Sequence, residues 1–524
     1  MRKNTNIIIA LLGLVLGVLF TLTALKVLGL NKKFDGDYNR WRKLNLILHE
    51  VQKNYVDTID MAVMTDAAVT AALAKLDPHS VYLPPVELEE SDSELAGNFE
   101  GIGITFNVPN DTAIVLSVIP GGPSEKAGLM AGDRILKVDE RVIAGVKTPQ
   151  DSMVRMMKGP AGTKVKISVS REKQMIPFEI TLGKIPVHSV DAAFMVSDTV
   201  GYIKLTKFSR TTYKEFVEAS SKLMDQGMTS LVFDLRDNTG GYFDQALLLS
   251  NEFLQKGDAI VYMEGLHRPR QQYDADGRGK MKDISLTVLI DEGSASSSEI
   301  FAGAIQDNER GVIVGRRSFG KGLVQEPINF TDGSGIRLTV ARFYTPSGRC
   351  IQKPYDKNYN YDIFERYAHG EMTSADSMKV DSTALYYTVK GRRVYGGGGI
   401  IPDTFVPIDT TKASKFFINC NKKAVMMRFA SNFFDRNKSS LSKIDDFARL
   451  EKWMNDVDVE QQFLNYAAKV ENLKPAAGEW EDTRWYMLPQ VKALVGRYSK
   501  LQDEAFYRFY LPIDNEFQTA LTEQ

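Results

Sequence analysis

The chain has 524 residues, of which 43% are hydrophobic and 25% are charged. This composition is typical of globular protein and excludes a fibrous or disordered chain, and the length suffices for about three or four domains. The 65 basic residues balance 66 acidic ones, so the net charge of −1 gives no electrostatic reason to expect a nucleic-acid partner.

Neither a disulfide framework nor a metal site is expected. Cys350 and Cys420 are the only cysteines, and the five histidines lie far apart in the sequence. No pair of histidines has the spacing of a helical zinc motif. We therefore expect no metal and no other cofactor.

The first 30 residues predict a signal anchor. Arg2 and Lys3 precede an uncharged apolar run over residues 7–25, whose length lies between a signal-peptide core and a spanning helix. No clear cleavage signal follows, so we favour an uncleaved anchor in the inner or plasma membrane, with the rest of the chain on the periplasmic, extracytoplasmic side. A cleaved signal peptide is the alternative. Basic residues after the run favour the opposite orientation, but large domains translocate largely regardless of such charges.

Residues 31–95 predict a helical region. Leu44, Ile47, Leu48 and Val51 follow the spacing of one helix face. The segment Leu76-Asp77-Pro78-His79-Ser80 breaks this pattern and begins an extended stretch.

Short strands and tight turns are expected over residues 96–186. The glycine-rich segment Gly101-Ile102-Gly103-Ile104 precedes a strand over residues 113–119, and Ala-Gly-Leu at 127–129 and Gly-Asp-Arg-Ile-Leu at 132–136 follow. In this order the segments resemble a PDZ domain. The glycine-rich loop of such a domain can hold a peptide's terminal carboxylate, and the neighbouring strand edge accepts an added strand. Gly101, Ile102, Gly103 and Ile104 are therefore the expected peptide-binding residues, although alone the glycines indicate only a tight turn.

Strands and helices alternate over residues 187–408. The runs 230–235, 286–290 and 312–314 are nearly continuously apolar, and helical patterns at 246–254 and 300–306 lie among them. This alternation predicts an α/β core with a parallel sheet. Residues 409–524 predict charged amphipathic helices that serve as scaffold, lid or oligomer contact. The expected fold class is thus α/β in an α+β multidomain chain: a PDZ-type β-rich domain and an α/β core, flanked by helical N- and C-terminal regions.

A serine-rich turn follows the strand at 286–290. Ser294-Ala295-Ser296-Ser297-Ser298 lies between that strand and a helix, where the free N–H groups of the helix start can stabilise an oxyanion. The alternative is structural, because Ser296-x-x-Glu299 before an apolar run is also a capping box. This stretch alone does not separate Ser296 from its serine neighbours as a nucleophile.

Lys321 is the candidate general base. It stands between Gly320 and Gly322 just after a buried strand, an unusual place for a solvated charge. Burial lowers the pKa of a lysine in the direction that a base requires, and Ser–Lys pairs are a known nucleophile–base arrangement. In an extended chain the Cα atoms of Lys321 and Gln325 would lie ~13 Å apart. We therefore expect either a bend at the glycines or an active geometry that forms only after a conformational change.

Together the segments Gly293 to Ile300 and Phe319-Gly320-Lys321-Gly322-x-x-Gln325 resemble the carboxy-terminal processing peptidases, the tail-specific proteases. Matching motifs elsewhere extend the resemblance over about residues 40–408, including Asp77-Pro78-His79-Ser80 and the stretch 234–241 that ends in Gly240-Gly241.

The resemblance implies a role for each site residue. Ser296 is the implied nucleophile, Lys321 its general base and Gln325 the residue that orients the lysine. The backbone N–H of Ser297 and that of Gly240 or Gly241 form the implied oxyanion hole, and Asp307 supports the site. Ser297 stands where the family often has Ala, and Thr239 where it often has Pro. Both positions act through backbone, so activity is expected to survive.

The sequence therefore predicts a serine endopeptidase that recognises the C-terminal tail of an exported or partly unfolded protein and cleaves it. Its expected partners are peptides with exposed C-termini and the membrane, and a homo-oligomer or an adaptor stays open. One alternative is a catalytically inactive PDZ scaffold. Another is a Ser-His-Asp hydrolase with His267 as base, which its charged surroundings disfavour.

Overall fold

The computed structural model describes residues 13–15, 17–18, 30–108, 111–119, 121–130, 132–171, 174–355, 359–409 and 414–523. The chain forms two compact units, residues 1–76 and 77–524. The first contains helices α2 (Leu30–Asn54) and α3 (Met61–Leu73). Asp60 caps α3, since its side chain accepts the N–H of Ala62 at 2.9 Å. These helices agree with the helical N-terminal region expected from the sequence.

The expected signal anchor lies largely outside the described residues. Of the first 30 residues, only 13–15, 17–18 and 30 are described, and they are helical. Within the described part of the chain, no helix combines the length and apolarity needed to cross a bilayer.

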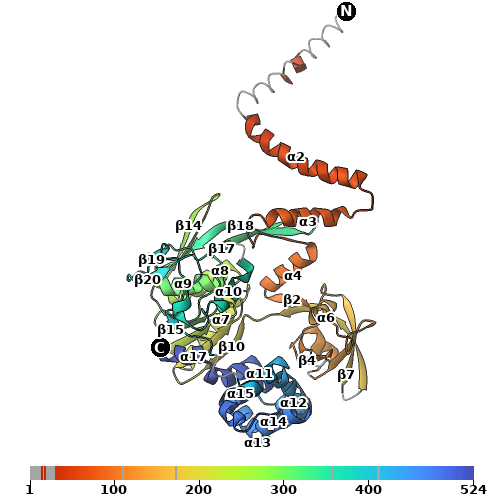
Figure 1. The fold of residues 1–524 in the computed structure, drawn as a ribbon, viewed down its shortest axis with the longest axis vertical. Helices are drawn as coiled ribbons and strands as arrows, with labels where there is room; N and C mark the ends of the chain where they lie inside the picture. The colour runs from red at the N-terminus through yellow and green to blue at the C-terminus, as the bar shows by residue number, and fades with distance from the viewer. Residues whose placement is uncertain are drawn as a thin grey trace, which may run out of the picture. The chain divides into compact units, whose positions relative to one another are not determined.

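The second unit begins with β1 (Val81–Leu83) and α4 (Pro85–Leu95) and continues into the region expected to be PDZ-like (Figure 1). This region contains β2 (Asn98–Gly101), β3 (Ile104–Asn107), β4 (Ala113–Val118), α5 (Pro123–Ala127), β5 (Arg134–Val138), β6 (Arg141–Val142), α6 (Gln150–Met157), β7 (Lys164–Arg171), β8 (Gln174–Thr181) and β9 (Gly183–Pro186). Its main sheet has the order β3-β4-β5-β7-β8, so β3 is an edge strand. Local signals set the ends of α5, which starts at Pro123 and stops at Gly128 with φ of 88°.

The core is built on a six-stranded sheet of order β10-β11-β12-β15-β16-β21. Its strands are β10 (Val190–Met195), β11 (Val200–Leu205), β12 (Ser230–Asp234), β15 (Ser285–Ile290), β16 (Val312–Gly315) and β21 (Thr404–Phe405). All neighbouring pairs are parallel except β10 with β11. The expected α/β core with a parallel sheet is therefore confirmed, with one antiparallel strand at its edge.

Both faces of this sheet are buried. Residues of α7 (Thr212–Asp225), α8 (Phe243–Phe253) and α9 (Ser297–Asp307) pack on one face, together with Phe233 and Val288. The alternate strand residues Val232 and Leu289 face the other layer, where they pack with Phe517 of the last helix. Burial on both faces explains why these strands are apolar without alternation.

A second sheet of antiparallel strands adjoins the core. It has the order β1-β18-β13-β14, with β17 also paired to β18. Its strands are β13 (Ala259–Gly265), β14 (Arg268–Asp274), β17 (Leu323–Asn329) and β18 (Gly335–Tyr344). The shorter elements η2 (Tyr359–Tyr361), α10 (Asp362–Ala368), η3 (Ala375–Ser377), β19 (Leu385–Tyr387) and β20 (Arg393–Tyr395) follow.

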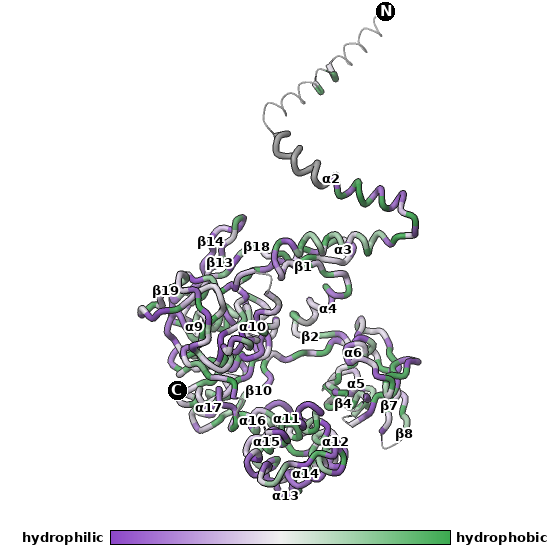
Figure 2. Tube along the Cα trace, in the orientation of Figure 1, coloured by the Kyte–Doolittle hydropathy of each residue, from purple (hydrophilic) through white to green (hydrophobic). Residues whose placement is uncertain are grey.

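The C-terminal region is helical, as expected. It contains α11 (Lys415–Lys422), α12 (Val425–Leu441), α13 (Phe447–Asp456), α14 (Val459–Lys469), α15 (Glu479–Gly496), α16 (Asp503–Tyr510), η4 (Leu511–Ile513) and α17 (Asn515–Thr522). Hydrophobic and hydrophilic segments both occur along these helices (Figure 2). Phe429, Phe463 and Trp480 pack in a core of their own, whereas α17 belongs to the layer that covers the parallel sheet.

Candidate active site

Ser296 lies at the junction of β15 and α9. The serine turn, residues 291–296, follows β15 directly, and α9 begins at Ser297. Ser296 has φ of 55° and ψ of −112°, a backbone conformation that costs a non-glycine residue about 1–3 kcal/mol and is typical of functional sites. The Asp291 carboxylate fixes the turn by accepting the N–H groups of Gly293 at 3.0 Å and Ser294 at 3.1 Å.

Lys321 lies in the lysine loop, residues 316–322, which connects β16 to β17. Its side chain is partly buried, and this burial is the main cause that lowers its pKa from the ordinary 10.5. The charge of Arg337 lowers the pKa further, whereas the charges of Glu299 and Asp77 oppose the shift. The net direction is the one that a neutral, proton-accepting lysine requires.

Glu299 ties the serine turn to the lysine loop. One carboxylate oxygen accepts the N–H of Ser296 and the N–H of Lys321, each at 2.8 Å. The other accepts the N–H of Gly320 at 2.7 Å and the hydroxyl of Ser318 at 2.5 Å. Glu299 is fully buried, and burial raises its pKa, while the four donors favour its charged form. A single carboxylate thus fixes the backbone on both sides of the site.

Gly240 and Gly241 lie beside the serine turn. Gly240 has φ of 95°, and a Cβ there would lie 2.8 Å from the Ser297 nitrogen. The N–H of Gly240 donates to Asn238 Oδ1 at 2.9 Å. Over the described residues, the N–H groups of Gly241 and Ser297 have no hydrogen-bond partner in the structure. Two unused donors therefore remain next to the serine.

The side chain of Ser297 gives the same loop a second fixing point. Its hydroxyl donates to the carbonyl oxygen of Gly241 at 3.0 Å. A residue expected to act through its backbone N–H alone thus also holds the neighbouring glycine through its side chain, a contact that Ala could not make.

The predicted residues surround one cavity of about 630 Å³. Ser296, Ser297, Lys321, Gln325, Gly240 and Gly241 all line it, with apolar side chains that include Leu95, Ile300, Leu323 and Phe343. A cavity of this size, with apolar walls and a few polar groups at one point, suits several residues of an extended peptide.

Gln325 is not bonded to Lys321 in this conformation. Its amide donates to the carbonyl oxygen of His79 at 2.5 Å. The pairing of β17 with β18 shifts register between Val324 and Gln325, which marks a bulge. Among the described residues, no hydrogen bond joins Ser296 Oγ to Lys321 Nζ either. Hydrogen bonds to Glu299 fix the backbone of the candidate site, whereas the side chains of Ser296, Lys321 and Gln325 are not hydrogen-bonded to one another.

His79 enters the site through the Asp77–Ser80 segment. Asp77 Oδ1 accepts the N–H of His79 at 2.8 Å and of Ser80 at 2.7 Å, and His79 Nε2 lies 2.5 Å from Tyr359 Oη. Burial and the charge of Lys321 lower the pKa of His79 from 6.5 to about 4. The sequence marked this segment as a break in the helical pattern and as a match to the family, without a role for His79. The two N–H groups that Asp77 accepts form an Asx turn, a conformation that Asp favours.

Asp307 and His267 lie away from this cavity. Asp307 is at the far end of α9, ~16 Å from Ser296 by helix rise. It is fully buried in an ion pair with Arg349 at 2.8 Å. His267 is exposed on the turn between β13 and β14 and does not line the cavity. Asp307 therefore makes a structural ion pair, and neither Asp307 nor His267 lines the cavity that contains Ser296.

The expected peptide-binding segment lies at the edge of the PDZ-type sheet. Ile102 is buried, and its N–H donates to the carbonyl oxygen of Met157 at the end of α6 at 3.2 Å. Gly103 has φ of 76° and leads into Ile104, the first residue of edge strand β3. Across the described ranges, no group of His, Cys, Asp and Glu side chains could hold a metal ion.

Two family models match the chain. A model described as "Peptidase family S41" matches residues 199–360, and one described as "PDZ domain" matches residues 101–182. The first match contains the serine turn, the lysine loop and both glycines, and the second contains the glycine-rich segment.

Curated relatives are similar over a longer part of the chain. A probable CtpA-like serine protease of Staphylococcus haemolyticus is 31% identical over 355 residues, which is 67% of this chain and 71% of that protein. A carboxy-terminal-processing protease of Bartonella bacilliformis is 34% identical over 319 residues, or 60% of this chain and 73% of that protein. Among solved structures, the photosystem II D1 C-terminal processing protease is 26% identical, with a TM-score of 0.37 and coverage of 69% of this chain and 86% of that one.

Proposed function

Because this chain belongs to peptidase family S41, among the carboxy-terminal processing proteases, we propose that it binds the C-terminal tail of a protein through its PDZ domain and cleaves that protein with Ser296 and Lys321. Membership of the family makes the chain a serine peptidase with peptide substrates. The assignment of residues to roles is our proposal.

The observation that carries the proposal is the Glu299 carboxylate, which accepts the N–H groups of both Ser296 and Lys321 at 2.8 Å. A helix cap needs only the first of these bonds. The second bond, from the N–H of Lys321, is not part of a helix cap. It fixes the lysine loop relative to the serine turn. Such fixed geometry is what nucleophilic catalysis requires.

In the proposed mechanism, neutral Lys321 accepts the proton of Ser296 Oγ as this oxygen attacks the scissile carbonyl carbon. The N–H groups of Ser297 and Gly241 stabilise the oxyanion, because the N–H of Gly240 is already bonded to Asn238. Lys321 then gives the proton to the leaving amine, and an acyl-enzyme remains on Ser296. A water molecule then gives a proton to Lys321 and attacks the acyl carbon. The bond from that carbon to Ser296 Oγ breaks, and Oγ takes the proton back from Lys321, which regenerates the serine and the neutral lysine.

Gln325 takes part only after a rearrangement. Its amide is bonded to His79, so we propose that it leaves the His79 carbonyl and orients Lys321 when substrate fills the cavity. Catalytic hydrogen bonds often tighten only once the substrate is bound, which makes such a step reasonable.

The PDZ domain is proposed to capture the substrate tail. Edge strand β3 can accept an added strand, and the segment Gly101 to Ile104 leads into it. The terminal carboxylate of the tail would bind backbone N–H groups of this segment other than that of Ile102, which already donates to Met157. Exposed tails occur on partly unfolded or newly exported proteins, which are the proposed substrates.

The proposed cellular setting rests on the sequence. The apolar run of residues 7–25 supports a membrane anchor with the enzyme on the extracytoplasmic, periplasmic side. We propose domains at 1–30 for the anchor, 31–95 for the helical N-terminal region, 96–186 for the PDZ domain, 187–408 for the peptidase core and 409–524 for the C-terminal helices.

Single substitutions test the proposal. Purified full-length wild type, Ser296→Ala, Lys321→Ala and His267→Ala are assayed on an unstructured protein with an apolar C-terminal tail. We expect Ser296→Ala and Lys321→Ala to lose cleavage at least ~10³-fold while keeping their tail affinity, and His267→Ala to cleave like wild type.

Other outcomes would favour the alternatives. Cleavage by Lys321→Ala at the wild-type rate would exclude the Ser–Lys pair, and loss in His267→Ala would favour a Ser-His-Asp site. A wild-type protein that binds tails but cleaves no peptide would be a scaffold.

A further inference from the structure

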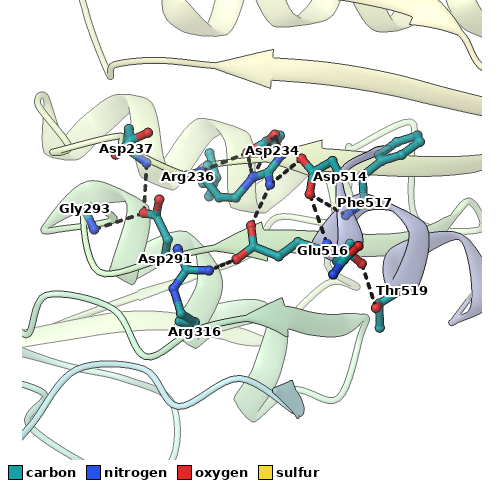
Figure 3. Close-up of polar contacts among 12 residues, drawn as sticks. Asp234, Arg236, Asp237, Asp291, Gly293, Arg316, Asp514, Glu516, Phe517 and Thr519 are labelled. Atoms are coloured by element: carbon teal, nitrogen blue, oxygen red, sulfur yellow. Dashed lines mark hydrogen bonds and ion pairs between the residues drawn. The ribbon is translucent and has the colours of Figure 1, made fainter. Parts of the chain in front are cut away.

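The last helix of the chain contacts the roots of the loops that form the site. In Figure 3, Asp514 and Glu516 at the start of α17 point towards Arg236 and Arg316, which extend from the ends of two core strands. One carboxylate oxygen of Glu516 accepts from Arg236 Nη1 at 2.6 Å, and the other accepts from Arg316 Nη1. Asp514 also accepts from Arg236 Nη1, at 2.7 Å. All four side chains are nearly inaccessible to solvent.

Arg236 begins the loop that ends in Gly240 and Gly241. It follows β12 by two residues, and its guanidinium is also bonded to Asp234. The next residue, Asp237, has φ of 56° and donates its N–H to Asp291 of the serine turn at 2.9 Å. The position of Arg236 therefore affects both the glycine loop and the serine turn.

Arg316 begins the lysine loop. It follows β16 directly, and its Nε donates to Glu292 of the serine turn at 2.7 Å. Lys321 follows five residues later in the same loop. Between these two residues, Phe319 donates its N–H to the carbonyl oxygen of Ser294 in the serine turn at 2.9 Å. Arg316 thus connects the serine turn with the loop of the base.

Among the described residues, Glu516 is the one whose carboxylate accepts hydrogen bonds from both of these arginines. Without its charge, Arg236 would keep Asp234 and Asp514, and Arg316 would keep Glu292. The fold would therefore retain ion pairs at each loop, but the two loop roots would lose their common anchor. Reaction rates are sensitive to such shifts, since a displacement of about 1 Å can cost ~10²-fold in rate.

The packing of α17 makes this anchor rigid. Phe517 is buried against the sheet face that contains Val232 and Leu289. Asp514 caps the helix by accepting the N–H of Glu516 at 3.0 Å. The helix is held by apolar contacts independent of the ion pairs, so the carboxylate of Glu516 has a fixed position relative to both strands.

We propose that Glu516, supported by Asp514, is a positioning residue of the peptidase: helix α17 fixes the loop that ends in Gly240 and Gly241 and the lysine loop relative to the serine, so the enzyme reaches full activity only when α17 is docked. This inference rests on the proposed roles of Ser296, Lys321 and Gly241. It extends the active site into a segment that lies outside the region matched by the peptidase model.

The test compares Glu516→Gln with Glu523→Gln, which changes a carboxylate at the other end of α17 that bonds Thr404. Active sites in each full-length preparation are counted by labelling with a fluorophosphonate, and kcat per labelled site and KM are measured on a tail peptide. The Ki of a peptide aldehyde, whose serine adduct places an oxyanion in the hole, is measured as well. We expect Glu516→Gln to lower kcat per site about 10-fold and to raise the aldehyde Ki by a similar factor. KM should stay within about 2-fold, and Glu523→Gln should match wild type.

Asp514→Asn is the second variant, and it keeps the test decisive if Glu516→Gln does not fold. Asn caps a helix as well as Asp does, so this variant keeps α17 while removing one charge from Arg236. We expect a fall in kcat per site of about 3-fold. Wild-type kcat per site in both variants would overturn the inference, as would a loss seen only as fewer labelled sites.

The proposed function is tested separately in the same assay. Ser296→Ala should abolish both labelling and turnover. If it does so while the Glu516 and Asp514 variants behave like wild type, only the positioning role fails. If Ser296→Ala keeps turnover, the assignment of the nucleophile itself is wrong.

Discussion

Replacing Glu299 with Gln should damage stability and catalysis together, because its carboxylate accepts four hydrogen bonds from the two sides of the site. Gln keeps one acceptor oxygen, so two of the four bonds are lost and an amide NH₂ faces N–H donors. Each hydrogen bond to a charged group contributes about 1.5–3 kcal/mol, so losing two of them lowers the free energy of unfolding by about 3–6 kcal/mol. The neutral Gln is less costly to bury than a carboxylate, which reduces the net loss to about 3 kcal/mol. Residues 77–524 form one compact unit, and an unfolding entropy of about 2.1 cal/mol/K per residue gives an expected fall in Tm of ~3 °C.

The same substitution should change the pH dependence of catalysis in a defined direction. The negative charge of Glu299 raises the pKa of Lys321, so its removal lowers that pKa. Since the neutral lysine is the active form, the acid limb of kcat/KM should move to lower pH while the maximum falls about 10²-fold.

The control is Glu326→Gln, which breaks an exposed ion pair with Arg268 whose partners are 46% and 48% accessible. Such a pair contributes at most about 1 kcal/mol. Thermal denaturation and kcat/KM between pH 5 and 10 measure both effects. A Glu299→Gln enzyme with the Tm and kcat/KM of the control, or with its acid limb at higher pH, would refute the reasoning.

Three further predictions follow from local geometry. Gly240→Ala should lower kcat at least ~10²-fold, because the new Cβ would lie 2.7 Å from a backbone oxygen of the serine turn, whereas Gly257→Ala, with a similar φ but open space, should affect only stability. His79 has a pKa of about 4 in the folded protein, against an ordinary value of 6.5. Between pH 4 and 6.5 the unfolded chain therefore binds more protons than the folded protein. Stability should therefore fall by about 2 kcal/mol more in wild type than in His79→Gln as pH drops from 6.5 to 4, measured by urea midpoints. Gly103→Ala should weaken binding of a fluorescent tail peptide at least ~10-fold, since its Cβ would lie 2.7 Å from Ile185; unchanged affinity would move the tail site elsewhere.

Local sequence was sufficient to predict the elements of the core. The strands at 230–235, 286–290 and 312–314 were expected from apolar runs, and β12, β15 and β16 lie at these positions. Strands buried on both faces of a parallel sheet consist almost entirely of apolar residues, so the sequence predicts them without knowledge of which strands they pair with. The expected fold class is confirmed for the same reason.

The site is different, because its working contacts join residues far apart in the sequence. The sequence read Glu299 as a helix cap, which accounts for its bond to Ser296 but not for those to Gly320 and Lys321. The family resemblance gave Gln325 the role of orienting the lysine, while the spacing left open either a bend or a contact that forms only after a conformational change. The bulge in β17 and the approach of His79 decide the partner of Gln325 in this conformation. No periodicity encodes such bonds, since they depend on which loops the folded sheet brings to one edge.

The sequence by itself therefore determined the strand and helix pattern and proposed a serine, a lysine and a pair of glycines. Only the tertiary structure decided that the N–H of Gly240 donates to Asn238 while the N–H of Gly241 has no partner among the described residues. It also decided that α17 packs on the sheet, where Glu516 accepts hydrogen bonds from Arg236 and Arg316. The physical reason is the same in both cases: propensity and periodicity act over a few residues, whereas the hydrogen bonds and ion pairs of this site form only after distant segments pack together.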